Sequence, residues 1–168
     1  RIRFYGIETE DKKNLFFNQY YANEFGINSR MDEIQSSILN FKLNKIDQFI
    51  KKRRNLANIY FKNLSTTELK LPNENIYCKH VFHLFTVRHR QAGKIIQKLK
   101  NKNIQARIIY QYPIHKMKAF KHYNINSNTL KITNKFSKQI FCLPLYPELK
   151  NYEIIKICKI LKKILKKI

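Results

Sequence analysis

The chain has 168 residues, of which 43% are hydrophobic and 13% aromatic, so it can bury a core and does not belong to the disordered class. Its 34 Lys and Arg residues against 11 Asp and Glu residues give a formal net charge of +23. No apolar run approaches membrane-spanning length, and the start at Arg1 does not resemble a signal peptide, which suggests an excerpt or a processed chain.

The positive charge has two interpretations. One is a polyanionic partner such as nucleic acid, an anionic membrane or a phosphorylated substrate. The other is a composition rich in Lys, Asn and Ile and poor in Gly, Pro and Trp, which AT-rich coding produces without any partner. Basic residues are spread over the whole length, which favours the second interpretation, so nucleic acid is not the expected partner.

The cysteines indicate a reduced, cytoplasmic protein. Cys78, Cys142 and Cys158 are odd in number and far apart, and no C-x-x-C pair occurs. Neither a disulfide framework nor a zinc site is therefore expected. His80 and His83 lie three apart in a predicted strand and would point to opposite faces, which argues against a shared metal.

The first predicted element follows an aromatic-rich, irregular stretch over residues 1–25. Apolar residues recur at helical spacing from about 29 to 64, and Ser29 with Asp32 fits a capping box at the start of this long helix. The turn-like segment that follows contains Pro72 and suggests a boundary. We therefore expect a division into residues 1–70 and a smaller unit over 71–168.

Strands and helices alternate in the second part, which predicts a small α/β or α+β unit with a short sheet. In chain order the expected elements are a strand at 80–89, a helix at 91–101, a strand at 104–110, a loop into a short helix at 112–120, a helix at 132–140, an extended segment at 141–149 and an amphipathic helix at 152–168.

Two places carry candidate chemistry. Gly26, Asn28, Ser29 and Arg30 precede the long helix, where free backbone amides and a guanidinium favour a phosphate or carboxylate, although most capped helices bind nothing. His115 lies in "YQYPIHK", a Pro-punctuated loop of the kind in which functional side chains concentrate, although a lone loop histidine is often inert. The chain contains no P-loop and no G-x-G-x-x-G or G-x-S-x-G motif, so the residues by themselves offer no complete catalytic set.

Several segments, in order along almost the whole chain, resemble the DegT/DnrJ/StrS family of sugar-nucleotide aminotransferases. The stretch "GINSRMDEIQSSIL" is similar to the family's G-x-N-x-R-[ML]-[DN]-E-[LIV]-Q-A-A-[IL]-L motif. The other similar segments are "RIRFYGIE", "HVFHLFTVR", "YQYPIHKMKAF" and "CLPLYPEL".

The resemblance implies the C-terminal part of a pyridoxal-phosphate enzyme of fold type I, working as a homodimer with shared active sites. Asn28 matches an asparagine that reaches across the dimer to the cofactor phosphate, and Arg30 would balance negative charge there. His115 matches a loop histidine beside the sugar-nucleotide pocket, with Tyr21 and Tyr110 as further substrate-binding candidates. Residues 1–70 would then end the large cofactor-binding domain, and residues 71–168 would form the small domain.

The departures from the family pattern concern catalysis and local turns. The family's catalytic lysine lies upstream of the segment that begins here, so no catalytic residue is assigned to this chain and the fragment alone should be inactive. Asn134 replaces the usual Glu, Lys131 an expected Pro, Cys142 a Ser and Asn103 a Gly.

The sequence therefore predicts part of an aminotransferase that takes an amino group, with glutamate as the expected donor, to a keto sugar nucleotide. A dTDP-3-keto-6-deoxyhexose is the expected substrate, and surface-polysaccharide synthesis is the expected role. Two alternatives stay open: a basic module that binds nucleic acid or anionic surfaces, and a non-catalytic remnant or partner subunit.

Overall fold

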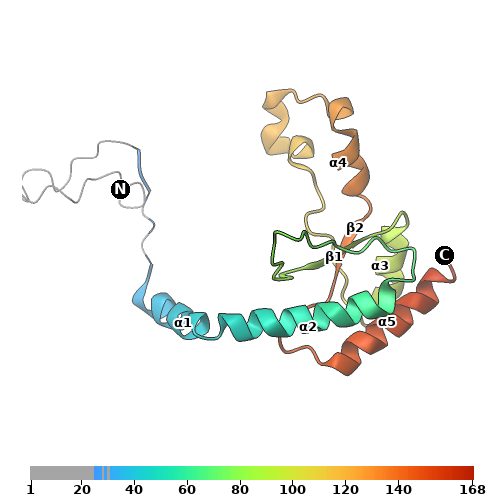
Figure 1. Cartoon of the computed structure of the whole chain (residues 1–168). Coiled ribbons are helices and arrows are strands. Elements are labelled where there is room, and N and C mark those ends of the chain that lie inside the picture. The colour runs from blue at the N-terminus through green and yellow to red at the C-terminus, as the bar shows by residue number, and fades with distance from the viewer. Residues whose placement is uncertain (1–24, 28, 30) are drawn as a thin grey trace, which may run out of the picture. The chain divides into compact units, whose positions relative to one another are not determined.

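The computed structural model describes residues 25–27, 29 and 31–168, and the chain divides into two compact units, residues 1–46 and 47–168 (Figure 1). The described part of the first unit contains α1 (Glu33–Leu43). The second unit takes in α2 (Ile46–Leu64) beyond its first residue, together with all later elements. These are β1 (Phe85–Arg88), α3 (Ala92–Lys100), the 3₁₀ turns η1 (Ile114–Lys116), η2 (Lys118–Tyr123) and η3 (Ser127–Leu130), α4 (Lys131–Phe136), β2 (Ile140–Leu143) and α5 (Asn151–Leu165).

The single helix predicted from 29 to 64 is two helices, and its predicted start is wrong. The first turn of α1 begins at Glu33, with Asp32 rather than Ser29 at the N-cap position and no side-chain capping bond. The helix then closes at Asn44, whose backbone N–H donates to the carbonyl of Asn40, and α2 starts two residues later. Asparagine is a weak helix former because its side chain competes for backbone hydrogen bonds, and periodicity alone does not show such a break.

The short sheet of the second unit pairs β1 with β2 in antiparallel register, with Phe85 opposite Leu143 and Arg88 opposite Ile140. Single bridges extend this pairing on both sides, because Lys70 pairs with Arg88 and Arg107 pairs with Cys142. The two strands themselves join segments that lie more than fifty positions apart in the sequence.

Two predicted strands differ from the structure. The segment 104–110 alternates as predicted, with Ile104 and Ala106 buried, but it meets the sheet through Arg107 alone before a turn at Ile109 and Tyr110. The strand expected at 80–89 is confined to Phe85–Arg88. His80 and His83 lie before it, so their predicted placement on opposite faces of a strand is wrong.

The core of the second unit is apolar, and no polar or charged residue of the described chain is buried within it. Tyr60 of α2 stacks on Phe85 of β1, with the ring centroids 4.7 Å apart. The Tyr60 hydroxyl donates to the carbonyl of Pro144 at 2.9 Å. The other large side chains that are fully buried are Phe141, Leu64, Ile95, Leu99, Ile154, Leu161 and Val87.

The helices α3 and α5 confirm the amphipathic patterns predicted for them. The apolar positions Ile154, Ile157, Cys158 and Leu161 of α5 are buried, and its predicted positions Leu165 and Ile168 pack half-buried against the core. Figure 1 shows α2, α3 and α5 gathered around the sheet of this unit.

Asn103 explains one departure from the family pattern. Its φ of 58° lies in the left-handed region, which glycine adopts freely and asparagine tolerates better than most residues. The backbone N–H of Ile104 donates to the carbonyl of Leu99, which closes the end of α3. Asparagine therefore maintains the turn for which the family pattern has glycine.

Candidate functional site

The predicted cofactor-binding residues Asn28 and Arg30 and the predicted substrate residue Tyr21 lie outside the described residues. His115 and Tyr110 are described, and both belong to the segment between α3 and β2. Their surroundings are therefore the part of the predicted site that can be built from contacts.

His115 is placed by a short helical turn and by an amide from α4. Pro113 precedes the 3₁₀ turn η1, with a φ of −60° that the proline ring favours, and the ring of His115 lies half-buried. Its Nε2 atom lies 3.1 Å from Oδ1 of Asn134. The Nδ2 atom of Asn134 in turn donates to the carbonyl and the hydroxyl of Ser127, at 2.8 and 3.0 Å.

The His115–Asn134–Ser127 cluster joins three separate elements, η1, α4 and the start of η3. The sequence indicates His115 as a candidate and Asn134 as a departure from the family pattern, but nothing in it connects the two residues. Their separation of 19 positions gives no periodic signal, and only the path of the chain between them brings the side chains together.

Tyr110 does not join this cluster by any hydrogen bond. It lies in the turn that ends the 104–110 segment, and its side chain is 82% exposed. Around it the segment from Tyr110 to Phe136 exposes an unusually apolar surface for a basic protein. The exposed large apolar side chains of this surface are Tyr110, Tyr112, Ile114, Met117, Phe120, Tyr123, Ile125, Ile132 and Phe136.

The C-terminal end of this exposed segment contacts the sheet. The Arg88 guanidinium of β1 lies over the ring of Phe136, 3.9 Å from its centroid, which is a cation–π contact. Figure 1 shows η1 to η3 and α4 projecting from the sheet of the second unit. The segment can therefore present side chains to a ligand while its ends stay attached to the core.

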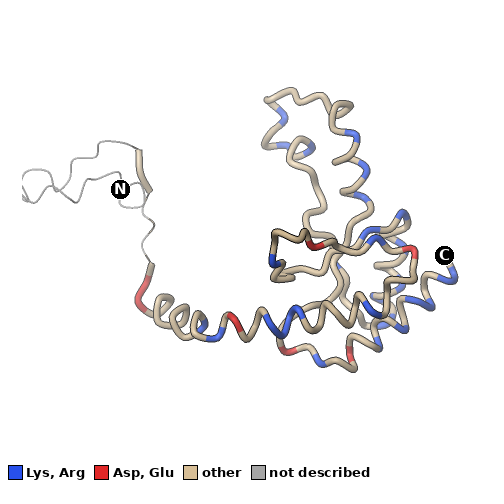
Figure 2. The backbone as a smooth tube through the Cα atoms, in the orientation of Figure 1, with Lys and Arg blue, Asp and Glu red and all other residues tan. Residues whose placement is uncertain are grey.

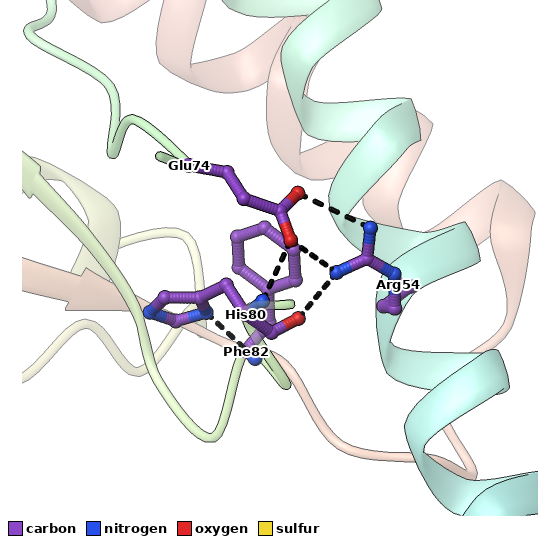
Figure 3. Close-up of polar contacts among 4 residues, drawn as sticks. All are labelled: Arg54, Glu74, His80 and Phe82. Carbon is purple, nitrogen blue, oxygen red and sulfur yellow. Dashed lines mark hydrogen bonds and ion pairs between the residues drawn. The ribbon is translucent and has the colours of Figure 1, made fainter. Parts of the chain in front are cut away.

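A second polar cluster holds the loop before β1 against α2 (Figure 3). Both guanidinium nitrogens of Arg54 donate to Glu74, at 2.6 and 3.1 Å, and Arg54 also donates to the carbonyl of His80. The backbone N–H of His80 donates to the same carboxylate, and Nδ1 of His80 accepts from the backbone N–H of Phe82.

The electrostatics of this cluster are those of a structural clamp. The hydrogen bonds from Arg54 and then from the His80 backbone lower the pKa of Glu74, while the bond to Glu74 raises the pKa of Arg54. Phe82, whose φ is 47°, is buried beside it. The sequence does not indicate the pairing of Arg54 with Glu74, because the two residues are 20 positions apart and the basic run "KKRR" does not show which arginine faces inward.

Other features of the described residues offer no ready site for chemistry. A surface cleft of about 780 Å³ is lined by Lys102, Arg107, Tyr146, Tyr152 and Lys156, and none of the predicted site residues lines it. Among the residues that the structure describes, no group of three or more His, Cys, Asp or Glu side chains could hold a metal ion. No helix in the same part of the chain is both long and apolar enough to cross a membrane.

Residues 1–162 match the model of the DegT/DnrJ/EryC1/StrS aminotransferase family, and the chain belongs to this family. It is 35% identical over 155 residues to dTDP-3-amino-3,4,6-trideoxy-alpha-D-glucose transaminase of Micromonospora megalomicea, covering 89% of this chain and 39% of that protein. It is 32% identical over 146 residues to dTDP-3-amino-3,6-dideoxy-alpha-D-galactopyranose transaminase of Aneurinibacillus thermoaerophilus, covering 86% of this chain and 40% of that protein. The chain thus spans about two fifths of the length of these relatives.

The fold is shared with solved sugar aminotransferases. The crystal structure of S. venezuelae DesV in complex with a ketimine intermediate matches with a TM-score of 0.87 and 24% identity, over 99% of this chain and 43% of that one. The predicted fold class, an α/β part of an aminotransferase with a short sheet, is confirmed by this likeness and by the β1–β2 pair.

Proposed function

We propose that the chain is the C-terminal portion of a pyridoxal-phosphate-dependent aminotransferase that converts a keto sugar nucleotide to an amino sugar. The observation that carries this proposal is the family match over residues 1–162. The two relatives described above support it, because both are transaminases named for dTDP-linked 3-amino sugars. Glutamate is the proposed amino donor, a dTDP-3-keto-6-deoxyhexose the proposed substrate, and cytoplasmic synthesis of surface polysaccharide the proposed role.

The proposed cofactor is recognised through its phosphate. The Asn28 amide and the Arg30 guanidinium are donors whose chemistry fits phosphate oxygens. They precede α1, whose N-cap residue Asp32 makes no side-chain bond to the first turn, so backbone amides there are not capped by that side chain. When bound, the cofactor supplies the aldehyde or amine that carries the transferred amino group.

The proposed enzyme is a homodimer, and this chain supplies only part of each active site. The Schiff-base lysine is expected in the part of the relatives that this chain does not span, so the fragment alone is expected to be inactive. In the intact enzyme, residues 1–70 would end the large domain and residues 71–168 would form the small one. Asn28 would serve the partner subunit's cofactor.

The sugar-nucleotide side of the site is assigned to His115, with Tyr110 and Tyr21 as neighbours. His115 supports this role because it is half-buried yet retains one ring nitrogen without a hydrogen bond among the described residues. Tyr110 supports it through its exposed ring in the same segment. An aromatic face and a ring nitrogen suit a sugar nucleotide better than they suit a small acid.

The test begins with the native product that contains this chain, isolated from its source cells. A mass well above 20.4 kDa, with glutamate-dependent conversion of a dTDP-3-keto-6-deoxyhexose to an amino sugar, is the expected result. A product that binds pyridoxal phosphate but aminates no keto sugar nucleotide would overturn the substrate class. A product that does not bind the cofactor would overturn the proposal as a whole.

A further inference from the structure

The side chain of Asn134 lies between His115 and Ser127, and its orientation can be worked out from its neighbours. Its two polar ends are an oxygen that accepts hydrogen bonds and a nitrogen that donates them. One end lies 2.8 Å from the backbone carbonyl of Ser127, and the other lies 3.1 Å from Nε2 of His115.

The carbonyl of Ser127 decides which end is which. A carbonyl oxygen only accepts, so the end that faces it must be the nitrogen Nδ2. The reversed amide would place two acceptors 2.8 Å apart without a proton between them. The oxygen Oδ1 of Asn134 must therefore face His115.

The orientation of the amide then decides the tautomer of the imidazole. Since Oδ1 of Asn134 cannot donate, Nε2 of His115 carries the proton and donates to it. In a neutral ring the other nitrogen, Nδ1, then has a lone pair and no proton. No hydrogen bond to Nδ1 of His115 is formed by the residues that the structure describes.

We propose that Asn134 is a positioning residue that holds neutral His115 in its Nε2–H tautomer and so presents Nδ1 as a hydrogen-bond acceptor. The ligand group that such a nitrogen recognises is a donor, which in a dTDP-linked hexose is a hydroxyl of the hexose, the deoxyribose 3′-hydroxyl or the thymine N3–H. The diphosphate offers only acceptors, so His115 does not address the phosphates, and the sugar side proposed for it above makes a hexose hydroxyl its partner. This functional part rests on the proposed sugar-nucleotide function, whereas the tautomer follows from the geometry alone.

The identity of residue 134 matters for the same reason. A glutamate there, as in the family pattern, would accept from Nε2 but would have no donor for the Ser127 carbonyl. Asparagine satisfies both neighbours and adds no charge beside the ring. The amide therefore ties η1, η3 and α4 together while it orients the imidazole.

The tautomer is tested by long-range ¹H–¹⁵N NMR on the ¹⁵N-labelled 168-residue chain, at a pH at which histidine is neutral. The His115→Gln variant identifies the His115 signals. The expected spectrum shows a protonated Nε2 and an unprotonated Nδ1, with a single tautomer. In Asn134→Leu the acceptor is lost, so we expect a mixture of the two tautomers, whereas Asn128→Leu, an exposed change on η3, should match the wild type.

The tautomer of His115 is first measured in the wild-type chain, so this part of the test does not depend on whether an Asn134 variant folds. A wild-type His115 with its proton on Nδ1 would overturn the assignment, and so would an Asn134→Leu spectrum with the tautomer unchanged. Asn134→Asp keeps an acceptor toward Nε2 although it loses the donor to the Ser127 carbonyl, so its His115 should favour the Nε2–H tautomer more than in Asn134→Leu. Circular dichroism confirms that each variant is folded before its spectrum is interpreted.

The recognition of a hydroxyl is tested by ligand binding to the intact native enzyme that contains this chain. In Asn134→Leu, affinity for a dTDP-linked 6-deoxyhexose should fall several-fold, while affinity for dTDP alone should stay unchanged. Equal losses for both ligands would overturn the sugar assignment. A wild-type enzyme with no transaminase activity would instead contradict the proposed function, and the tautomer measured by NMR would be unaffected by that result.

Discussion

Tyr60 anchors the core of the second unit by two separable interactions, and replacing it with phenylalanine removes only one of them. Its ring stacks on Phe85, and its hydroxyl donates to the carbonyl of Pro144 at 2.9 Å. Tyr60 is 0% exposed, whereas Pro144, which carries the acceptor, is half-buried and lines the surface cleft. Tyr60→Phe keeps the stacking and leaves the Pro144 carbonyl without this donor.

The expected cost follows from these contacts. Because the Pro144 carbonyl is only half-buried, the loss of its donor should cost about 1 kcal/mol, while Tyr60→Ala would add the loss of a large buried ring, about 3–5 kcal/mol. For a chain of this length, 1 kcal/mol corresponds to roughly 2–4 °C in Tm. Urea unfolding should therefore show a lower midpoint for Tyr60→Phe with an unchanged m value.

Tyr152→Phe is the matched control, because its ring is 62% exposed and the change should stay within about 0.5 kcal/mol of the wild type. If Tyr60→Phe and Tyr152→Phe unfold at the same urea concentration, the hydroxyl of Tyr60 contributes nothing to stability. The assignment of Tyr60 as a polar anchor of the core would then be refuted.

Four further results are expected. Because Arg54 lowers the pKa of Glu74, the ionised Glu74 stabilises the fold at neutral pH, and this stabilisation is lost as Glu74 is protonated at acidic pH. Glu74→Gln should therefore reduce the difference in unfolding free energy between pH 7 and acidic pH, measured by urea titration. Burial raises the pKa of Cys158 to about 11, so the free energy of unfolding should fall as the pH rises above 9. Cys158→Ala should make this decrease with pH shallower by about 1.4 kcal/mol per pH unit, and equal slopes in the variant and the wild type would contradict the prediction. Asn28→Ala in the proposed homodimer of the intact enzyme should weaken retention of pyridoxal phosphate, measured by absorbance after dialysis; unchanged affinity would exclude the proposed role of Asn28. Because Lys and Arg are scattered over the elements of the second unit (Figure 2), generic DNA should be released by modest salt; affinity that persists would favour a dedicated polyanion site.

Local pattern was sufficient for the helices that pack on the core. The apolar spacing of α3 and α5 predicted both elements and their buried faces, because a helix repeats every 3.6 residues and its partner is a single surface. The ordered motifs likewise predicted the family from the sequence alone, and the family match over residues 1–162 confirms it.

Features that depend on distant partners were beyond the reach of local pattern. The 104–110 segment alternates like a strand, yet the turn at Ile109 and Tyr110 limits its pairing to Arg107. The predicted long helix is interrupted at Asn44, where the sequence contains no proline or glycine that would predict a break.

The sequence by itself determined the family, the core-facing residues of α3 and α5 and the candidate role of His115. Only the tertiary structure decided that Asn134 reaches His115 and that Arg54 clamps Glu74. The physical reason is that apolar periodicity records which face of an element avoids water, whereas a hydrogen bond between side chains depends on where two separate elements meet.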